Sequence, residues 1–296
     1  LVFLLVLIAL SMDALPLLPM QPLRRLPGHS LCRPAICLAA ATLVLTFVVC
    51  YILWLNKGCQ AFLPYISDLG LHGLSRSLFM TGLLVSAICL TLALPHVVVA
   101  RTMFIRVFAL PSSTKVLNLS LLLSGCIVIL GLFGLGFAPW DEDLDVHLLF
   151  AECIFLGGFW WAAGSWLLFH RFHRAADYRG WCVSPLSRKV QLPLCLLNAA
   201  TIAYVTACFA GAKAEDPIMF EQEGLRKLLR LALTDFPAYC EGKQGLHALT
   251  WINWAALGEW IYCLSLMLGL LASVADLEAH NAAAARSQIV SADVVS

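Results

Sequence analysis

The chain has 296 residues, of which 61% are hydrophobic and 12% are charged. A soluble domain carries about 25% charged residues, so a soluble protein of this length is excluded, as are the fibrous and disordered classes. Nineteen basic and eighteen acidic residues leave a net charge of +1, which argues against nucleic acid or any strongly charged partner. The composition therefore predicts a polytopic membrane protein.

The first 33 residues are predicted to be an N-terminal leader or a cytosolic segment. Residues 1–10 are apolar, and several prolines follow them before residue 28. This start is compatible with a partial seventh span, with a signal-like remnant, or with upstream sequence wrongly joined before a start at Met12. We favour an artefact or a dispensable leader for residues 1–11.

Six stretches are apolar over the roughly 20 residues that a helix needs to cross the hydrocarbon core of a bilayer. Because unpaired backbone groups are too unfavourable in lipid, each stretch is predicted to be a helix, and the fold class is all-α. The predicted spans are residues 34–55, 77–100, 116–138, 148–169, 190–212 and 246–274. They form one transmembrane domain over residues 34–274, which a flexible cytosolic tail over residues 275–296 follows.

Basic residues gather in every second connection between the predicted spans, whereas residues 141–145 in an opposite connection are mostly acidic. The positive-inside rule then places both termini in the cytosol. The richest basic connection follows the fourth span, and we expect it to meet anionic lipid at about 1 kcal/mol per basic residue. A solvated loop that only sets topology is an equally simple alternative. The residues concerned are Arg171, Arg174, Arg179, Arg188 and Lys189.

Two acidic residues lie within predicted spans, where ionisable groups usually face the interior of the bundle. Glu152 precedes His170 by 18 residues, and Glu259 precedes Asp276 by 17 residues. At the rise of an α-helix, both carboxylates lie about 25–27 Å above the cytosolic ends of their spans. We expect them to converge at the outer rim, where we also expect Asp68, His72, His147, His247 and Trp260.

Three interpretations of this cluster stay open. The three histidines with one carboxylate could hold a zinc ion that activates water against a lipid ester or amide. No HExxH or HxxxH pair occurs, however, so we predict no metal. A second interpretation is a pocket in which Glu152, Glu259 and Trp260 face a lipid headgroup or a small ligand. The plainest one is that the polar groups only form hydrogen bonds between helices.

Asn118 and Asn198 are single amides in the third and fifth spans, and we predict a structural role in interhelical hydrogen bonds. Most of the twelve cysteines fall inside apolar runs, where a thiol packs as a small hydrophobic group. Only Cys59 and Cys240 are expected on the outer face, where an oxidising compartment would allow them to form a disulfide. Pairing and absence of pairing are equally compatible with the sequence.

The motifs predicted at the outer face resemble those of a known family. Residues 62–70 read Phe-Leu-Pro-Tyr-Ile-Ser-Asp-Leu-Gly and resemble the PYISDTG loop of the damage-regulated autophagy modulator (DRAM) family. That family groups with the yeast Sfk proteins and the Frag-type GPI-anchor remodelling proteins. Asn118 and His147 resemble the openings of its third and fourth spans, and Glu259-Trp260 resembles its final segment. The resemblance extends over roughly residues 34–278.

The resemblance implies a six-span fold and a lipid-linked context, but no particular reaction. We predict a non-enzymatic membrane protein that senses or organises lipids and modulates autophagy, trafficking or membrane-lipid homeostasis. The alternative is a GPI-lipid or sphingolipid remodelling enzyme with its site at the outer face. Members of the family occur in the lysosome, Golgi, ER and plasma membrane, so the resemblance does not select one compartment. No cofactor is expected. The residues expected to contact a lipid or other ligand are Asp68, His147, Glu152, His247, Glu259 and Trp260.

Overall fold

The structure is a computed structural model that describes residues 29–59, 64–71, 73–178, 185–215, 217 and 247–293. Residues 1–28 of the predicted leader (residues 1–33) lie outside this part of the chain, and residues 29–33 belong to the first helix. Within the described residues all regular structure is helical, which confirms the all-α prediction. The elements are α2 (His29–Asn56), η3 (Ser67–Gly70), α3 (Gly73–Val107), α4 (Ser112–Phe137), α5 (Leu144–Tyr178), α6 (Pro185–Glu215) and α9 (His247–Asp293).

All six α-helices are long and apolar enough to cross a membrane, as the sequence predicts. The candidate spans agree with the predicted ones to within a few residues at most ends; they are Cys32–Asn56, Gly73–Arg106, Ser112–Phe137, Leu144–Ala175, Lys189–Glu215 and Trp251–Val274. Large apolar side chains such as Leu45, Leu92 and Leu156 are exposed along these helices. In a bilayer these side chains face lipid, so their exposure is compatible with a stable fold.

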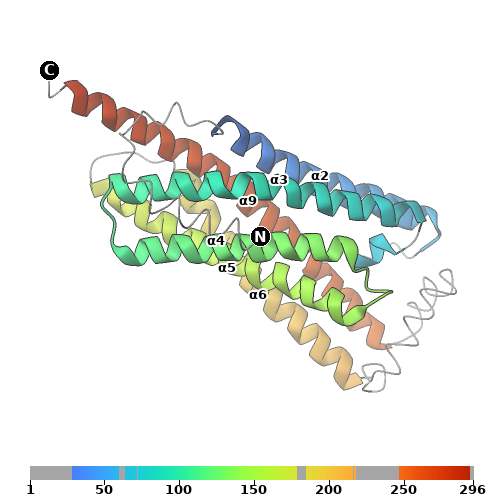
Figure 1. The fold of residues 1–296 in the computed structure, drawn as a ribbon. Coiled ribbons are helices and arrows are strands. Elements are labelled where there is room, and N and C mark those ends of the chain that lie inside the picture. Colours follow the sequence, from blue (N-terminus) through green and yellow to red (C-terminus); the bar gives the residue numbers. More distant parts are fainter. Residues whose placement is uncertain are drawn as a thin grey trace.

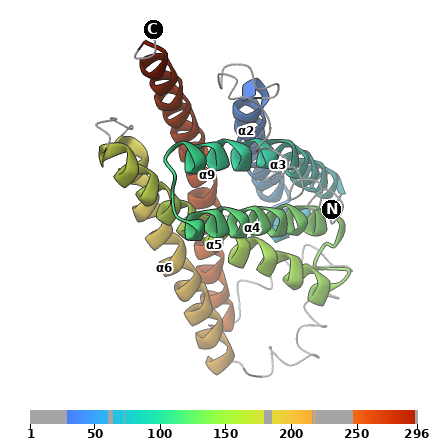
Figure 2. The same cartoon turned by 60° about the vertical axis from the view of Figure 1, so that its left-hand side comes forward.

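The helices follow one another around the bundle in chain order. α2 packs on α3, α3 on α4, α4 on α5 and α5 on α6. α9 pairs with α6 and also contacts α2, α3 and α5, so it closes the bundle. Both ribbon views show the pair of α6 and α9 inclined to the pair of α2 and α3 (Figures 1 and 2). Polar residues on α9 are therefore within reach of nearly every other helix.

The bundle has two chemically different ends. The η3 end contains the residues that join α2 to α3 and α4 to α5, and the acidic residues Asp141 and Glu142 lie there. At the opposite end, which we call the basic end, α3 turns into α4 and α5 finishes. Lys115 and Lys189 are exposed near this basic end. This charge asymmetry agrees with the pattern seen in the sequence, although sidedness itself stays a prediction.

α9 is longer than the sequence predicts. It has 47 residues and continues to Asp293, through most of the segment predicted to be a flexible tail. Its last turns project beyond the other helices (Figure 1). Residues 282–285 are four consecutive alanines, and alanine has the highest intrinsic helix propensity. Local propensity thus favours continuing the helix beyond the membrane-spanning part.

Candidate functional site

Two adjacent residues of α9 attach this helix to residues 64–71 at the η3 end. The backbone N–H of Ile66 donates to Oε2 of Glu259 at 2.9 Å. The indole Nε1 of Trp260 donates to the carbonyl of Pro64 at 2.9 Å. The ring of Trp260 also packs edge-on against Phe47, with the ring centroids 5.9 Å apart. A charge-assisted bond, a neutral bond and an aromatic contact thereby fix one turn of α9.

Asp68 organises the segment to which Glu259 binds. Its side chain is almost fully buried, and its Oδ2 accepts the backbone N–H of Tyr65 at 3.1 Å. Burial and then the nearby carboxylates of Glu259 and Asp68 raise the pKa of the Tyr65 phenol above its ordinary value. The phenol therefore stays protonated at physiological pH. Its buried oxygen has no hydrogen-bond partner among the described residues.

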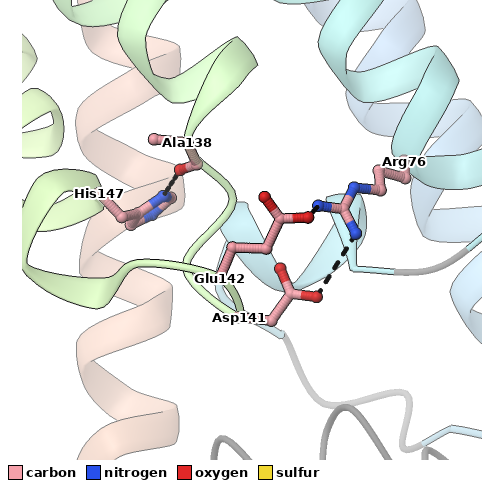
Figure 3. Close-up of polar contacts among 5 residues, drawn as sticks. All are labelled: Arg76, Ala138, Asp141, Glu142 and His147. Carbon is pink, nitrogen blue, oxygen red and sulfur yellow. Dashed lines mark hydrogen bonds and ion pairs between the residues drawn. The ribbon is translucent and has the colours of Figure 1, made fainter.

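His147 lies at the start of α5 and is also buried. Its Nδ1 is 2.8 Å from the carbonyl oxygen of Ala138, which follows α4 (Figure 3). Because a carbonyl only accepts, the proton lies on Nδ1, and in the neutral ring Nε2 remains as an acceptor. Asp68 and Asp141 both lie within electrostatic range of the imidazole. The site thus combines one imidazole with carboxylates from separate elements.

An ion cluster at the start of α3 holds the neighbouring connection in place. Arg76 Nη1 lies 3.6 Å from Oδ2 of the buried Asp141, and its Nη2 pairs with Glu142 (Figure 3). The cluster joins α3 to the residues between α4 and α5, from which His147 follows directly. The cluster therefore fixes the connection that leads into the first turn of α5, where His147 lies.

A cavity of about 90 Å³ begins beneath these polar groups. Ser67, His147 and Glu259 belong to its wall, and most of its other lining residues are apolar side chains of α2, α3, α4, α5 and α9. A second cavity of about 70 Å³ shares four lining residues with the first and extends to Val97 and Trp161, towards the basic end. The shared residues are Leu90, Val128, Leu266 and Leu270. The two cavities are therefore adjacent, and we call them together the apolar path; its polar end is at Ser67, His147 and Glu259.

One family model matches residues 34–280, and its description is the Frag1/DRAM/Sfk1/Cwh43P N-terminal domain. The match includes residues 64–71 and the candidate spans of all six helices, except for the first two residues of the Cys32–Asn56 span. The chain belongs to this family. The resemblance noted in the sequence is thereby confirmed. No curated protein and no solved structure gives a significant match.

In this Frag1/DRAM-family chain, the predicted site residues divide into two groups. Asp68, His147, Glu259 and Trp260 lie at the η3 end, as described above. Glu152 does not join them, because it is exposed on α5 between the exposed residues Leu149 and Leu156. Its neighbours Ala151 and Ile154 line the cavity, so Glu152 lies on a different face of the helix.

Other predicted positions fall on parts of this family member that the structure does not describe. His72, Arg179 and Cys240 lie outside the described residues, and the side chains of His247 and Arg188 are not described either. Cys59 is disulfide-bonded. Among the described residues, no group of three or more His, Cys, Asp or Glu side chains has a metal-binding arrangement.

The two predicted structural amides of this family member contact neighbouring helices. Asn118 Nδ2 donates to Thr102 Oγ1 at 3.0 Å and to the carbonyl of Val98 at 3.3 Å. Asn198 Oδ1 accepts the hydroxyl of Ser265. These bonds join α4 to α3 and α6 to α9 within the apolar interior, where few other polar partners exist.

Arg101 is a buried polar residue whose environment the sequence reasoning did not anticipate. It directly follows the predicted second span (residues 77–100), but it lies within α3 and is almost fully buried. Its guanidinium stacks over Trp161 at 4.8 Å and donates to Ser165 Oγ at 3.1 Å. The apolar residues on both sides of Arg101 in the sequence were the available signal, since a loop arginine rarely has such flanks.

Proposed function

We propose that this protein is a non-enzymatic, integral membrane lipid sensor or organiser. It holds part of a single lipid inside the bundle, with the headgroup at the η3 end. The observation that carries the proposal is the apolar cavity whose wall includes Ser67, His147 and Glu259 at one end. Ligand sites are typically apolar with a few polar groups that fix orientation, and this cavity has that composition.

The dimensions favour an acyl chain or a similarly slender apolar group. Each cavity has about half the volume of a ~150 Å³ cavity that takes up benzene, so together they accommodate a short stretch of chain. From Glu259 to Leu270 the path follows eleven residues of α9, or about 16 Å. The remainder of a long chain would stay in the bilayer or widen the path.

The polar end favours a headgroup that donates hydrogen bonds. Glu259 and the nearby Asp68 carry negative charge, which disfavours a strongly anionic headgroup at this end. A hydroxyl or amine would instead find carboxylate oxygens and the Nε2 acceptor of His147. We therefore expect the ligand to be a lipid whose headgroup presents hydroxyl or amine groups.

A ligand at this position would touch several elements that otherwise meet only through a few bonds. His147 begins α5, Ser67 belongs to η3, and Glu259 lies on α9. If the lipid makes better contacts in one arrangement of these elements than in another, its binding shifts the bundle towards the better-bound arrangement. This coupling is the step by which we propose that the protein modulates autophagy, trafficking or membrane-lipid homeostasis, in an endomembrane or the plasma membrane.

Native mass spectrometry with cavity-filling variants tests the proposal. Ala151 lines the cavity on α5, whereas Ala41 is exposed on α2. We expect wild type and Ala41→Phe to retain one co-purified lipid per chain, and Ala151→Phe to lose most of it while unfolding at a similar temperature. Equal lipid retention by a folded Ala151→Phe variant, or a wild type with no bound lipid, would contradict the proposal.

A remodelling enzyme acting on GPI-lipids or sphingolipids is the second candidate. Its support is that an imidazole and a carboxylate, His147 and Glu259, line the same cavity, and such groups serve as acid and base in acyl transfer. Product analysis of lipids incubated with purified protein separates the two. Turnover that is lost in a His147→Gln or Glu259→Gln variant that remains folded under the assay conditions would favour the enzyme over the sensor.

A further inference from the structure

A groove of about 690 Å³ lies at the basic end, far from the cavity of the proposed function. One wall consists of the turn after α3 and the first turn of α4, and the other is the C-terminal part of α5. The groove combines two arginines and two hydroxyls with an apolar floor; it is lined by Phe108, Leu110, Pro111, Ser113, Thr114, Arg171, Arg174 and Ala175.

Arg171 is held in a defined orientation in this groove. Its Nη1 donates to Thr114 Oγ1 at 3.1 Å and to Ser113 Oγ at 3.3 Å. Thr114 is itself fully buried, so the partner of the guanidinium does not move freely. A guanidinium has five N–H donors in a rigid fork, and these two contacts leave others available for a ligand.

Arg174 adds a second charge on the same wall. It lies three residues after Arg171 on α5, a spacing that places both side chains on one face of the helix, and it is exposed. In the described part of the chain, neither arginine forms a salt bridge with a carboxylate. The groove therefore has an excess of positive charge and an oriented donor in Arg171, and the positive end of the α4 helix dipole adds to this charge.

We propose that this groove binds an anionic glycerophospholipid by its phosphate. The planar guanidinium of arginine can donate two parallel hydrogen bonds to phosphate oxygens. Basic pockets between helices at a membrane surface bind anionic lipid headgroups. Phe108, Leu110 and Ala175 offer contacts to the glycerol and the first methylenes of the lipid. The site is distinct from a diffuse attraction by the whole basic connection, because it depends on Arg171 and Arg174 rather than on total charge.

A pair of double variants with equal loss of charge distinguishes these alternatives. Arg171→Gln with Arg174→Gln removes the two groove charges. Lys115→Gln with Lys189→Gln removes two exposed charges near the same end, neither of which lines the groove. Binding of phosphatidic acid and phosphatidylcholine to the purified full chain would be titrated by native mass spectrometry.

We expect wild type and the lysine double variant to bind phosphatidic acid at least tenfold more tightly than phosphatidylcholine. The arginine double variant is expected to lose this preference. If the two double variants lose affinity equally, or if wild type shows no preference, the groove site is refuted. Because Arg171 also bonds to Ser113 and Thr114, the single variant Arg174→Gln serves if the double variant fails to fold, and it should lose at least threefold in preference.

Competition by glycerol 3-phosphate separates a lipid site from a site for a soluble phosphate. Glycerol 3-phosphate contains the phosphate and the glycerol of the lipid but no acyl chain. We expect it to displace phosphatidic acid only at a concentration at least a hundredfold higher than that of the lipid. Displacement at equal concentrations would show that the apolar floor contributes nothing, and it would overturn the assignment to a lipid.

Discussion

The carboxylate of Glu259 joins parts of the chain that lie 193 residues apart, through the backbone N–H of Ile66. Hydrogen bonds to charged groups contribute about 1.5–3 kcal/mol to stability. Trp260 adds a second bond on the same turn, to Pro64. This turn of α9 therefore contributes both to stability and to the wall of the cavity.

Glu259→Ala should lower the free energy of unfolding by about 2 kcal/mol, since it leaves the N–H of Ile66 without its acceptor. Glu259→Gln should lower the free energy of unfolding by about half as much, because the amide oxygen still accepts the hydrogen bond from Ile66. The measurement is reversible unfolding in mixed detergent micelles. Glu152→Ala is the matched control, as this exposed acid should change stability by less than about 0.5 kcal/mol. Equal effects at both positions would contradict the placement of Glu259.

Close contact between α4 and α5 depends on glycines of α4. A methyl group on Gly134 would overlap the ring of Phe150, and one on Gly131 would lie 2.8 Å from the carbonyl oxygen of Phe150. A methyl group on Gly136 would lie 3.5 Å from Leu84 Cγ, an ordinary contact. The glycine pattern thus sets the distance between the two helices, and with it the position of His147 above the cavity.

Gly134→Ala should destabilise the bundle by about 1–3 kcal/mol through overpacking against Phe150. Gly136→Ala should be neutral or stabilising by up to about 1 kcal/mol, because alanine favours the helix. Unfolding of both variants under identical detergent conditions checks the pair. The helix contact would be wrongly placed if Gly136→Ala proved the more damaging change.

The disulfide at Cys59 bears on the orientation of the bundle. Nine cysteines are free among the described residues, so of the twelve in the chain only Cys182 and Cys240 remain as partners within it. α5 has 35 residues, is about 50 Å long and ends at Tyr178 at the basic end. In the sequence, Cys182 follows Tyr178 by four residues. Cys59 follows α2 at the η3 end. Cys240 is therefore the partner we expect, and an oxidising compartment at the η3 end agrees with a cytosolic basic end.

Cys59→Ser and Cys240→Ser should each abolish the shift in mobility between reducing and non-reducing gels, whereas Cys182→Ser should leave it intact. The physical reason is reach, since a disulfide requires Cα atoms within about 7 Å. Peptide mapping of the oxidised protein identifies the linked pair directly. A shift that depends on Cys182 and not on Cys240 would contradict both the pairing and the assignment of the ends.

The six spans and the division into a basic and an acidic end were readable from the chain alone. Both depend on local composition, because a run of about 20 apolar residues is sufficient for a membrane-crossing helix. The family motifs likewise pointed to residues 64–71 and to Glu259 and Trp260, which the structure joins by hydrogen bonds. The extension of α9 to Asp293 was not predicted. The segment after residue 274 has no apolar run, but its alanines have a strong helix propensity.

Packing alone decided which polar residues meet. Glu152 and Glu259 have the same chemistry and a similar predicted depth, but the rotation of each helix about its own axis directs Glu259 to the cavity wall and leaves Glu152 exposed. Arg101 is buried against Trp161 for the same reason. Rotation depends on small residues and side-chain contacts between helices that are distant in sequence, and in lipid these contacts replace the hydrophobic effect as the force that selects a face. A sequence pattern fixes where along a helix a residue lies, whereas its direction is set by the neighbouring helices.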